Sequence, residues 1–288
     1  MTKKQLGAAG LLLIATLIWG ASFILMKDAL DALPTFWLLA IRFCSASVLL
    51  GLIFFKRLRT LRPSDFGAGA VIGGFIFLAY VFQTFGLAHT TPGKNAFLTA
   101  VYCVMIPFIW WIMTKKRPSV MTFAAAGICM AGIGLISLDS GFSLGLGDGL
   151  TMVGGTFFAF HIVAVTKLSR DRDVLALTVL QFFFAGIYSL AGALIFEKPP
   201  TEFSLGVVLN LGYLCVFATA VALLFQNIGQ KYLPPTLSSI LISLESVFGA
   251  VFSFIFGYEA PDLRTVIGFV LIFAAVALAQ IGSSEKSE

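Results

Sequence analysis

The sequence predicts an all-α polytopic membrane protein, with ten transmembrane helices arranged as two inverted five-helix repeats around a central cavity. Three observations predict this fold: the composition, ten long apolar runs, and a match between the two halves of the chain. Of the 288 residues, 59% are hydrophobic and only 11% are charged, whereas soluble domains have about 45–50% and 25%. Because so few charges cannot cover a soluble surface, the composition disfavours a soluble enzyme, a disordered chain and a nucleic-acid-binding domain.

Ten apolar runs are long enough to be membrane spans, since a helix needs about 20 apolar residues to cross a bilayer core of about 30 Å. Polar, Pro or Gly residues separate them. The expected spans are 6–26, 35–55, 66–88, 95–113, 120–138, 148–168, 174–195, 204–230, 236–257 and 263–282. The runs are longer than the alternating segments of about 10 residues that form membrane barrels. The first run follows Lys3 and Lys4 but exceeds a signal-peptide core and lacks a cleavage motif, so we expect it to be retained.

The Lys and Arg residues are unevenly divided between the two sides that ten spans would create. Fourteen of the 19 fall in the tails and loops on the side of the termini, four fall on the other side, and Arg42 lies inside a span. Cytoplasmic loops carry the excess of positive charge. We therefore expect a bacterial cytoplasmic membrane protein with both termini in the cytoplasm, and the net charge of +5 reports topology.

The two halves of the chain match at a shift of 143 residues, which aligns Gln83 with Gln226 and further Gly and Pro residues in register. We expect two domains, 1–140 and 141–288, with five spans each. Because five is an odd number, the second repeat would enter the membrane inverted. Inverted repeats are typical of transporters, whose substrate site lies near the midplane between the repeats, and two such units could rock about it.

Several short motifs resemble those of one family, in order and along essentially the whole chain. They are residues 19–23 (WGASF), Lys27, Pro34, Arg42, residues 86–92, Pro107, residues 243–248 (SLESVF) and residues 257–260 (GYEA). Together they resemble the drug/metabolite transporter superfamily of the ten-helix EamA type, although Ser246 stands where many members have Pro. The resemblance implies a central cavity lined by spans 1, 3, 4, 6, 8 and 9. It also implies export of metabolites or amino acids without ATP or a prosthetic group, so we expect no cofactor.

Polar residues inside spans are the candidates for the site, because a charge near the bilayer centre costs at least about 2.5–3.5 kcal/mol unless it faces a cavity or a partner. The expected cavity residues are Trp19, Ser22, Tyr80, Gln83, Thr99, Tyr102, His161, Gln226 and Glu245. Glu245 would contact a substrate amine, couple transport to protons, or form a structural contact between helices. The 143-residue shift aligns it with Tyr102, which predicts that both lie near the midplane.

Arg42 is the other charge well inside a span. It would either bind a substrate carboxylate or, as we favour, have a gating or structural role near the extracellular end of the second span. Its expected partners are then Asp28 or Asp31, which are close in sequence and suitable for charge-assisted hydrogen bonds.

The sequence as a whole predicts a secondary transporter that exports small organic metabolites, most of all amino acids, by alternating access. It is expected to be a monomer in the lipid bilayer that binds no nucleic acid and no metal, with protons as a candidate coupling ion. A nucleotide-sugar or sugar-phosphate exchanger of the same fold is the alternative, but it would need more cationic cavity residues than Arg42. A membrane enzyme or assembly protein is the other class. It is disfavoured because no carboxylate cluster, His pair or activated nucleophile is visible.

Overall fold

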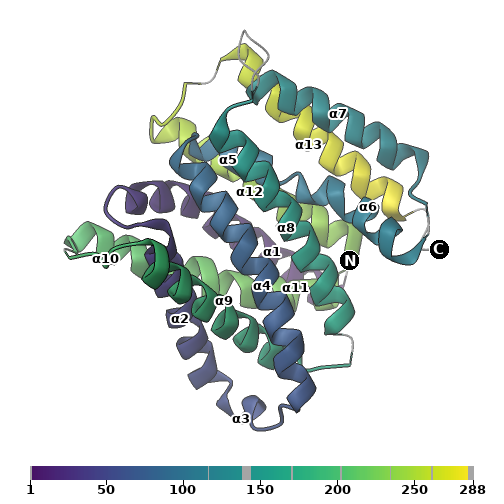
Figure 1. The fold of residues 1–288 in the computed structure, drawn as a ribbon. Helices are drawn as coiled ribbons and strands as arrows, with labels where there is room; N and C mark the ends of the chain where they lie inside the picture. The colour runs from purple at the N-terminus through teal and green to yellow at the C-terminus, as the bar shows by residue number, and fades with distance from the viewer. Residues whose placement is uncertain are drawn as a thin grey trace.

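The computed structural model describes residues 2–115, 117–137, 144–169, 171–201, 203–233, 235–260 and 262–284, and within them the chain is helical and forms no β-strand (Figure 1). The boundary expected between the two repeats, at 140/141, lies outside the described residues. The helices are α1 (Lys3–Leu30), α2 (Thr35–Ile53), α3 (Phe55–Leu58), α4 (Pro63–Ala88), α5 (Pro92–Thr99), α6 (Tyr102–Thr114), α7 (Val120–Ser137), α8 (Leu146–Leu168), α9 (Val174–Phe196), α10 (Leu205–Gly212), the π-helix η1 (Tyr213–Val221), α11 (Ala222–Tyr232), α12 (Pro235–Ile255) and α13 (Leu263–Ser284).

The lengths and compositions of these helices are those of a multi-pass membrane protein. Seven helical stretches in the described residues are long and apolar enough to cross a bilayer, and three shorter apolar helices lie in α7, α12 and α13. Every expected span coincides with helical structure, while ten complete crossings remain a prediction. Two expected spans are irregular: 95–113 is interrupted at Ala100–Val101 between α5 and α6, and 204–230 contains η1 at its centre.

Polar caps begin several of these helices and prevent their first amides from being left unpaired. Thr91 caps α5, which continues with Pro92, and Asp173 caps α9 by accepting from the amides of Leu175 and Ala176. Partial burial alone would raise the pKa of Asp173, but its hydrogen bond from Arg57 and those two amide bonds together lower this pKa below its usual value. These polar interactions lie at helix ends, where they fix how the apolar segments enter the bundle.

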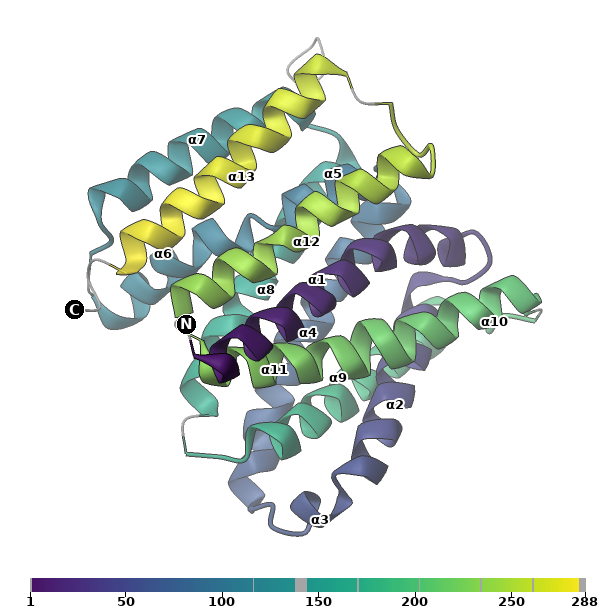
Figure 2. The same ribbon diagram turned by 180° about the vertical axis from the view of Figure 1, so that it is seen from behind.

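The two halves of the chain are interleaved. The main partners of α4 are α8 and α9, those of α1 are α12 and α11, and α2 packs against α9. At one edge of the molecule α7 and α13 form a separate pair, which is visible from both sides (Figures 1 and 2). Each of these pairs joins a helix of the first half to one of the second. The cavity is therefore built by mixed groups of helices.

Glycines allow these mixed pairs to approach until their backbones touch, as small residues do in membrane bundles. A Cβ built on Gly73 of α4 would lie 2.7 Å from the carbonyl oxygen of Gln181 and 2.8 Å from Cβ of Phe184, both in α9. A Cβ built on Gly154 of α8 would lie 2.8 Å from the backbone nitrogen of Gln83 in α4. The close spacing between α4, α8 and α9 thus depends on glycine at these two positions, because any larger residue would clash.

We expect Gly73→Ala to lower stability by about 1–3 kcal/mol, the usual cost of overpacking a close contact. Gly67→Ala is the matched control on the same helix, since a Cβ there would meet nothing within 4 Å. In the control, removal of glycine from a helix interior is expected to be neutral or stabilising by up to about 1 kcal/mol. Thermal unfolding in detergent, followed by loss of the monodisperse chromatographic peak, measures both. Equal unfolding temperatures for the two variants would contradict the close packing.

Candidate functional site

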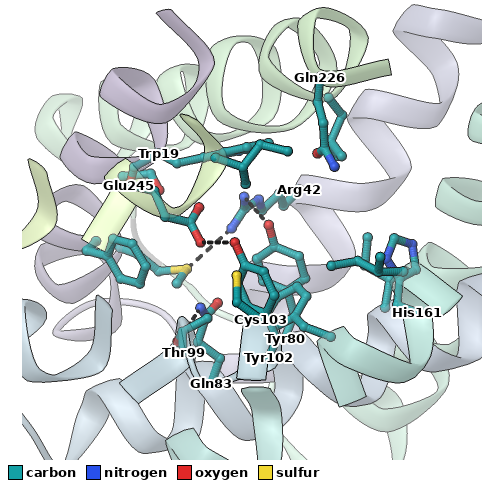
Figure 3. A pocket seen from close by; sticks show the side chains of 18 of the residues that line it. Trp19, Arg42, Tyr80, Gln83, Thr99, Tyr102, Cys103, His161, Gln226 and Glu245 are labelled. Atoms are coloured by element: carbon teal, nitrogen blue, oxygen red, sulfur yellow. Dashed lines mark hydrogen bonds between the residues drawn. The ribbon is translucent and has the colours of Figure 1, made fainter. Parts of the chain in front are cut away.

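A cavity lies inside the bundle, and the unfilled space within it and at its mouth, open solvent included, is about 870 Å³. Its wall is formed by side chains from eight helices, namely α1, α2, α4, α5, α6, α8, α11 and α12 (Figure 3). The lining residues are Trp19, Ser22, Phe23, Met26, Arg42, Ile76, Tyr80, Gln83, Thr99, Tyr102, Cys103, Ile106, Phe158, His161, Ile162, Leu223, Gln226, Ile242 and Glu245. The wall thus combines aromatic and aliphatic faces with a few polar ends, as expected of a small-molecule site.

The structure places all nine residues that we expected to line a cavity in the wall of this one. They come from α1, α4, α5, α6, α8, α11 and α12. The placement follows from bilayer chemistry: polar side chains inside spans turn away from lipid, so their polarity alone predicts that they face the interior. Two of them flank the interruption of the fourth span, because Thr99 ends α5 and Tyr102 begins α6.

The expected pairing of Arg42 with Asp28 or Asp31 is wrong, whereas its gating or structural role near the extracellular end stays a prediction. Its side chain is 1% exposed and lines the cavity. Its Nε donates to Thr219 Oγ1 at 2.6 Å, Nη2 donates to Tyr80 Oη at 3.2 Å, and Nη1 contacts the Met26 sulfur at 3.4 Å. The guanidinium carbon also lies 4.4 Å from the centre of the Tyr80 ring, a cation–π distance.

Glu245 of α12 also points into the cavity and is 8% exposed. It accepts a hydrogen bond from the Tyr102 hydroxyl, with 3.2 Å between Oη and Oε1. These two residues are the ones that the 143-residue shift aligns, and the structure joins them directly. In Figure 3 the charged ends of Arg42 and Glu245 point toward the same central region, beside the hydroxyls of Tyr80 and Tyr102.

Arg42 and Glu245 form no ion pair with each other. The described residues contain two ion pairs, Arg57–Asp173 at 2.7 Å and Arg172–Asp65 at 2.9 Å, and both lie away from the cavity. One cavity therefore contains a buried guanidinium and a buried carboxyl group, each hydrogen-bonded to a tyrosine and not to the other. Ionisable residues inside membrane spans are costly and face a cavity or a partner, so these two residues mark a candidate binding site.

Other polar groups of the wall are fixed by bonds to the protein. Gln83 Nε2 donates to Thr99 Oγ1 at 2.9 Å, and Trp19 Nε1 donates to the Ala218 carbonyl at 2.7 Å. Ser22 bonds back to its own helix at the carbonyl of Trp19.

His161 lies with its Nε2 3.0 Å from Oε1 of Gln181 in α9. Gln181 is buried behind the wall and was not expected from the sequence, although it is a polar residue inside a span.

Polar contacts also join the ends of helices on the side expected to be extracellular. Asp28 accepts a hydrogen bond from the Tyr258 hydroxyl and not from Arg42. Burial raises the pKa of Tyr258 to about 12, and the hydrogen bond to the Asp28 carboxylate acts in the same direction. Nearby, Thr91 donates to Glu259 at 2.7 Å. These bonds connect the first half of the chain to the loop between α12 and α13. A gating or structural role for Asp28 stays a prediction.

Sequence reasoning missed Thr219 and the apolar part of the wall. Thr219 is a small hydroxyl residue in an apolar span, where such residues usually bond their own helix, so nothing in its type marked it. Apolar wall residues such as Met26 and Phe158 resemble the lipid-facing residues around them. Only three-dimensional placement separates the two groups.

Comparisons with known proteins agree with the membrane fold. The EamA-like transporter family matches residues 6–138 and 145–280. An "uncharacterized transporter" of Archaeoglobus fulgidus is 32% identical over 97% of this chain and 87% of its own length. An "S-adenosylmethionine/S-adenosylhomocysteine transporter" of Chlamydia muridarum is 25% identical over 91% and 88%. The "uncharacterized inner membrane transporter YedA" of Escherichia coli is 22% identical over 97% and 92%. A solved crystal structure covers 97% of this chain and 99% of its own with a TM-score of 0.70 and 18% identity, which supports the fold.

Proposed function

Because the chain belongs to the EamA-like transporter family, we propose that it is a secondary transporter that exports small zwitterionic metabolites, amino acids above all, by alternating access. One observation carries the proposal: Arg42 and Glu245 line the same cavity and do not pair with each other. A zwitterion presents an anion and a cation together. Its carboxylate would bind the guanidinium, which favours planar carboxylates, while its ammonium group would bind Glu245.

The remainder of the wall supports a bulky apolar or aromatic side chain on the substrate. Trp19, Phe23, Phe158 and the two tyrosines offer aromatic faces, and Met26 adds a polarisable thioether. S-adenosylhomocysteine, named for one relative, is itself an α-amino acid that carries an adenosine group. It belongs to the same chemical class and is a sensible member of a substrate panel.

The sugar-phosphate exchanger is less well supported by this cavity. A phosphate carries up to two negative charges and is bound by clusters of Arg and Lys or by helix N-termini. Among the residues that line the cavity, Arg42 is the one with a permanent positive charge, and Glu245 would repel a phosphate.

The inverted-repeat architecture is supported by the positions at which helices begin. The helices α5 and α12 begin at Pro92 and Pro235, and α7 and α13 begin at Val120 and Leu263. Both pairs are 143 residues apart, the same shift that relates the two halves of the sequence. Because the halves are interleaved, the units that move during alternating access would each contain helices of both repeats.

The orientation with both termini in the cytoplasm rests on the distribution of Lys and Arg. In both views the N-terminus and the end of α13 lie toward the same side of the molecule, which accords with it (Figures 1 and 2). A reporter that is active only in the cytoplasm, fused to the C-terminus, tests this orientation, and an inactive fusion would reverse it.

Transport by the purified protein in liposomes tests the function. We expect saturable counterflow of L-phenylalanine or another bulky amino acid. We expect much weaker competition from 2-phenylethylamine, which lacks the carboxylate, and from 3-phenylpropanoate, which lacks the ammonium group. The panel also contains small polar amino acids, S-adenosylhomocysteine and a sugar phosphate. Protein-free liposomes are the control. If the folded protein carries a sugar phosphate and no zwitterion, or carries no solute, the proposal is wrong.

A further inference from the structure

The eighth expected span contains a π-helix, η1, between α10 and α11 (Figure 2). In a π-helix the backbone amide of residue i bonds the carbonyl of residue i−5. Such turns are rare, and many of those that occur lie at functional sites. The Thr219 hydroxyl follows this spacing and donates to the Leu214 carbonyl, five residues earlier, at 2.7 Å. The Trp19 indole bonds the neighbouring Ala218 carbonyl, also within η1. The π-helix thus contains two groups that bond residues of the cavity wall: the Ala218 carbonyl bonds Trp19, and the Thr219 hydroxyl bonds Arg42.

Thr219 fixes the Arg42 side chain in one orientation. Its hydroxyl proton is donated to Leu214, so its oxygen is left to accept from Arg42 Nε at 2.6 Å. Both side chains are at most 1% exposed, so water does not replace either bond. The Thr219 hydroxyl therefore acts as a fixed acceptor behind the guanidinium.

The remaining hydrogen bonds of Arg42 leave two donors free for a ligand. A guanidinium has five N–H groups. Bonds to Thr219, Tyr80 and Met26 use one each on Nε, Nη2 and Nη1. One N–H then remains on each terminal nitrogen of a group that lines the cavity. Two donors on one guanidinium are what bidentate binding of a carboxylate requires.

We propose that Thr219 is a positioning residue for the carboxylate end of the substrate: through η1 it holds Arg42 so that its two free N–H groups face the cavity. The inference rests on the proposed transport of zwitterions and adds a specificity determinant that does not itself line the cavity. Without the Thr219 acceptor, the guanidinium would turn to satisfy Nε and would lose its fixed pair of donors.

The test compares Thr219→Val, which keeps the shape and removes the acceptor, with Thr219→Ser, which keeps the hydroxyl. Thr156→Val is the matched control, since the Thr156 hydroxyl bonds its own helix at Met152 and Thr156 does not line the cavity. Liposome counterflow gives KM and the maximal rate for L-phenylalanine, and competition gives the affinity of 2-phenylethylamine. We expect Thr219→Val to raise KM about 5- to 30-fold, less than most of the roughly 10- to 150-fold range for a lost hydrogen bond to a charged group, because Thr219 acts on the substrate only through Arg42. The maximal rate and the affinity for 2-phenylethylamine should be near wild type.

The serine variant should restore KM, and Thr156→Val should behave as wild type. Thermal unfolding verifies folding, and Thr219→Ala is the second variant if valine prevents it. Equal KM values for Thr219→Val and Thr156→Val would overturn the inference, as would an equal loss of affinity for the amine, or a serine variant as impaired as valine. A wild-type protein that carries no zwitterion would instead remove the proposed function and this inference with it.

Discussion

Replacement of Arg42 by methionine is expected to raise KM for L-phenylalanine by about 30-fold or more, because charge-assisted hydrogen bonds contribute roughly 1.5–3 kcal/mol each. The same variant should lose affinity for 3-phenylpropanoate and keep its affinity for 2-phenylethylamine, which has no carboxylate. Arg42→Lys retains the charge without the planar pair of donors, so it should fall between wild type and methionine. Liposome counterflow and competition measure all three variants and ligands.

Arg59→Met is the matched control for Arg42, since Arg59 is exposed near the end of α3 and its guanidinium lies 4.6 Å from the centre of the Phe55 ring. It should transport as wild type. Arg42 also packs against Tyr80, so thermal unfolding must show that the methionine variant is folded before its transport is compared. A folded Arg42→Met protein with wild-type KM for L-phenylalanine would show that the carboxylate binds elsewhere.

Glu245→Gln is expected to have the complementary effect. The amide keeps the size of the side chain and an oxygen that can accept from Tyr102, but it removes the negative charge beside the substrate ammonium group. KM for L-phenylalanine and the inhibition constant of 2-phenylethylamine should both rise about 10- to 100-fold, whereas 3-phenylpropanoate should bind at least as well as before. Exposed Asp171 provides the control, as Asp171→Asn. Parallel losses for all three ligands would indicate damage to the cavity rather than loss of one charge.

The same variant tests whether Glu245 couples transport to protons. Counterflow is measured with and without a pH gradient across the liposome membrane. If Glu245 takes up and releases the coupled proton, Glu245→Gln should lose the stimulation by the gradient while it retains exchange of substrate at high concentration. A variant with full dependence on the gradient would exclude Glu245 as the coupling group.

The sequence predicted the helical membrane fold and the residues that gather in the cavity because both follow from one physical cost. Polar groups in a bilayer must find partners or water, so Glu245 and His161 had to face inward. The position of Arg42 could not be predicted in this way. Its partner Thr219 is 177 residues away, whereas sequence proximity favoured Asp28.

The two backbone irregularities could not be predicted from the sequence either. Pro107 is the obvious helix breaker in the fourth span, yet it lies inside α6 and the interruption occurs at Ala100–Val101. The π-helix has no compositional mark, since residues 213–221 are ordinary apolar and small residues. The interruption lies in close contact with a neighbouring helix, since a Cβ on Gly155 of α8 would lie 3.0 Å from the carbonyl oxygen of Thr99. A pattern along one segment does not contain that information.

The interleaving of the two halves has a consequence for biosynthesis. The ribosome delivers α1 to α7 to the membrane before any of α8 to α13, so the glycine-lined face of α4 and the partner face of α7 at first lack their native partners. Lipid contact gives these helices little reason to adopt their final spacing, because association in a bilayer depends on close contact between matching faces. The native arrangement therefore forms late, when α13 reaches α7.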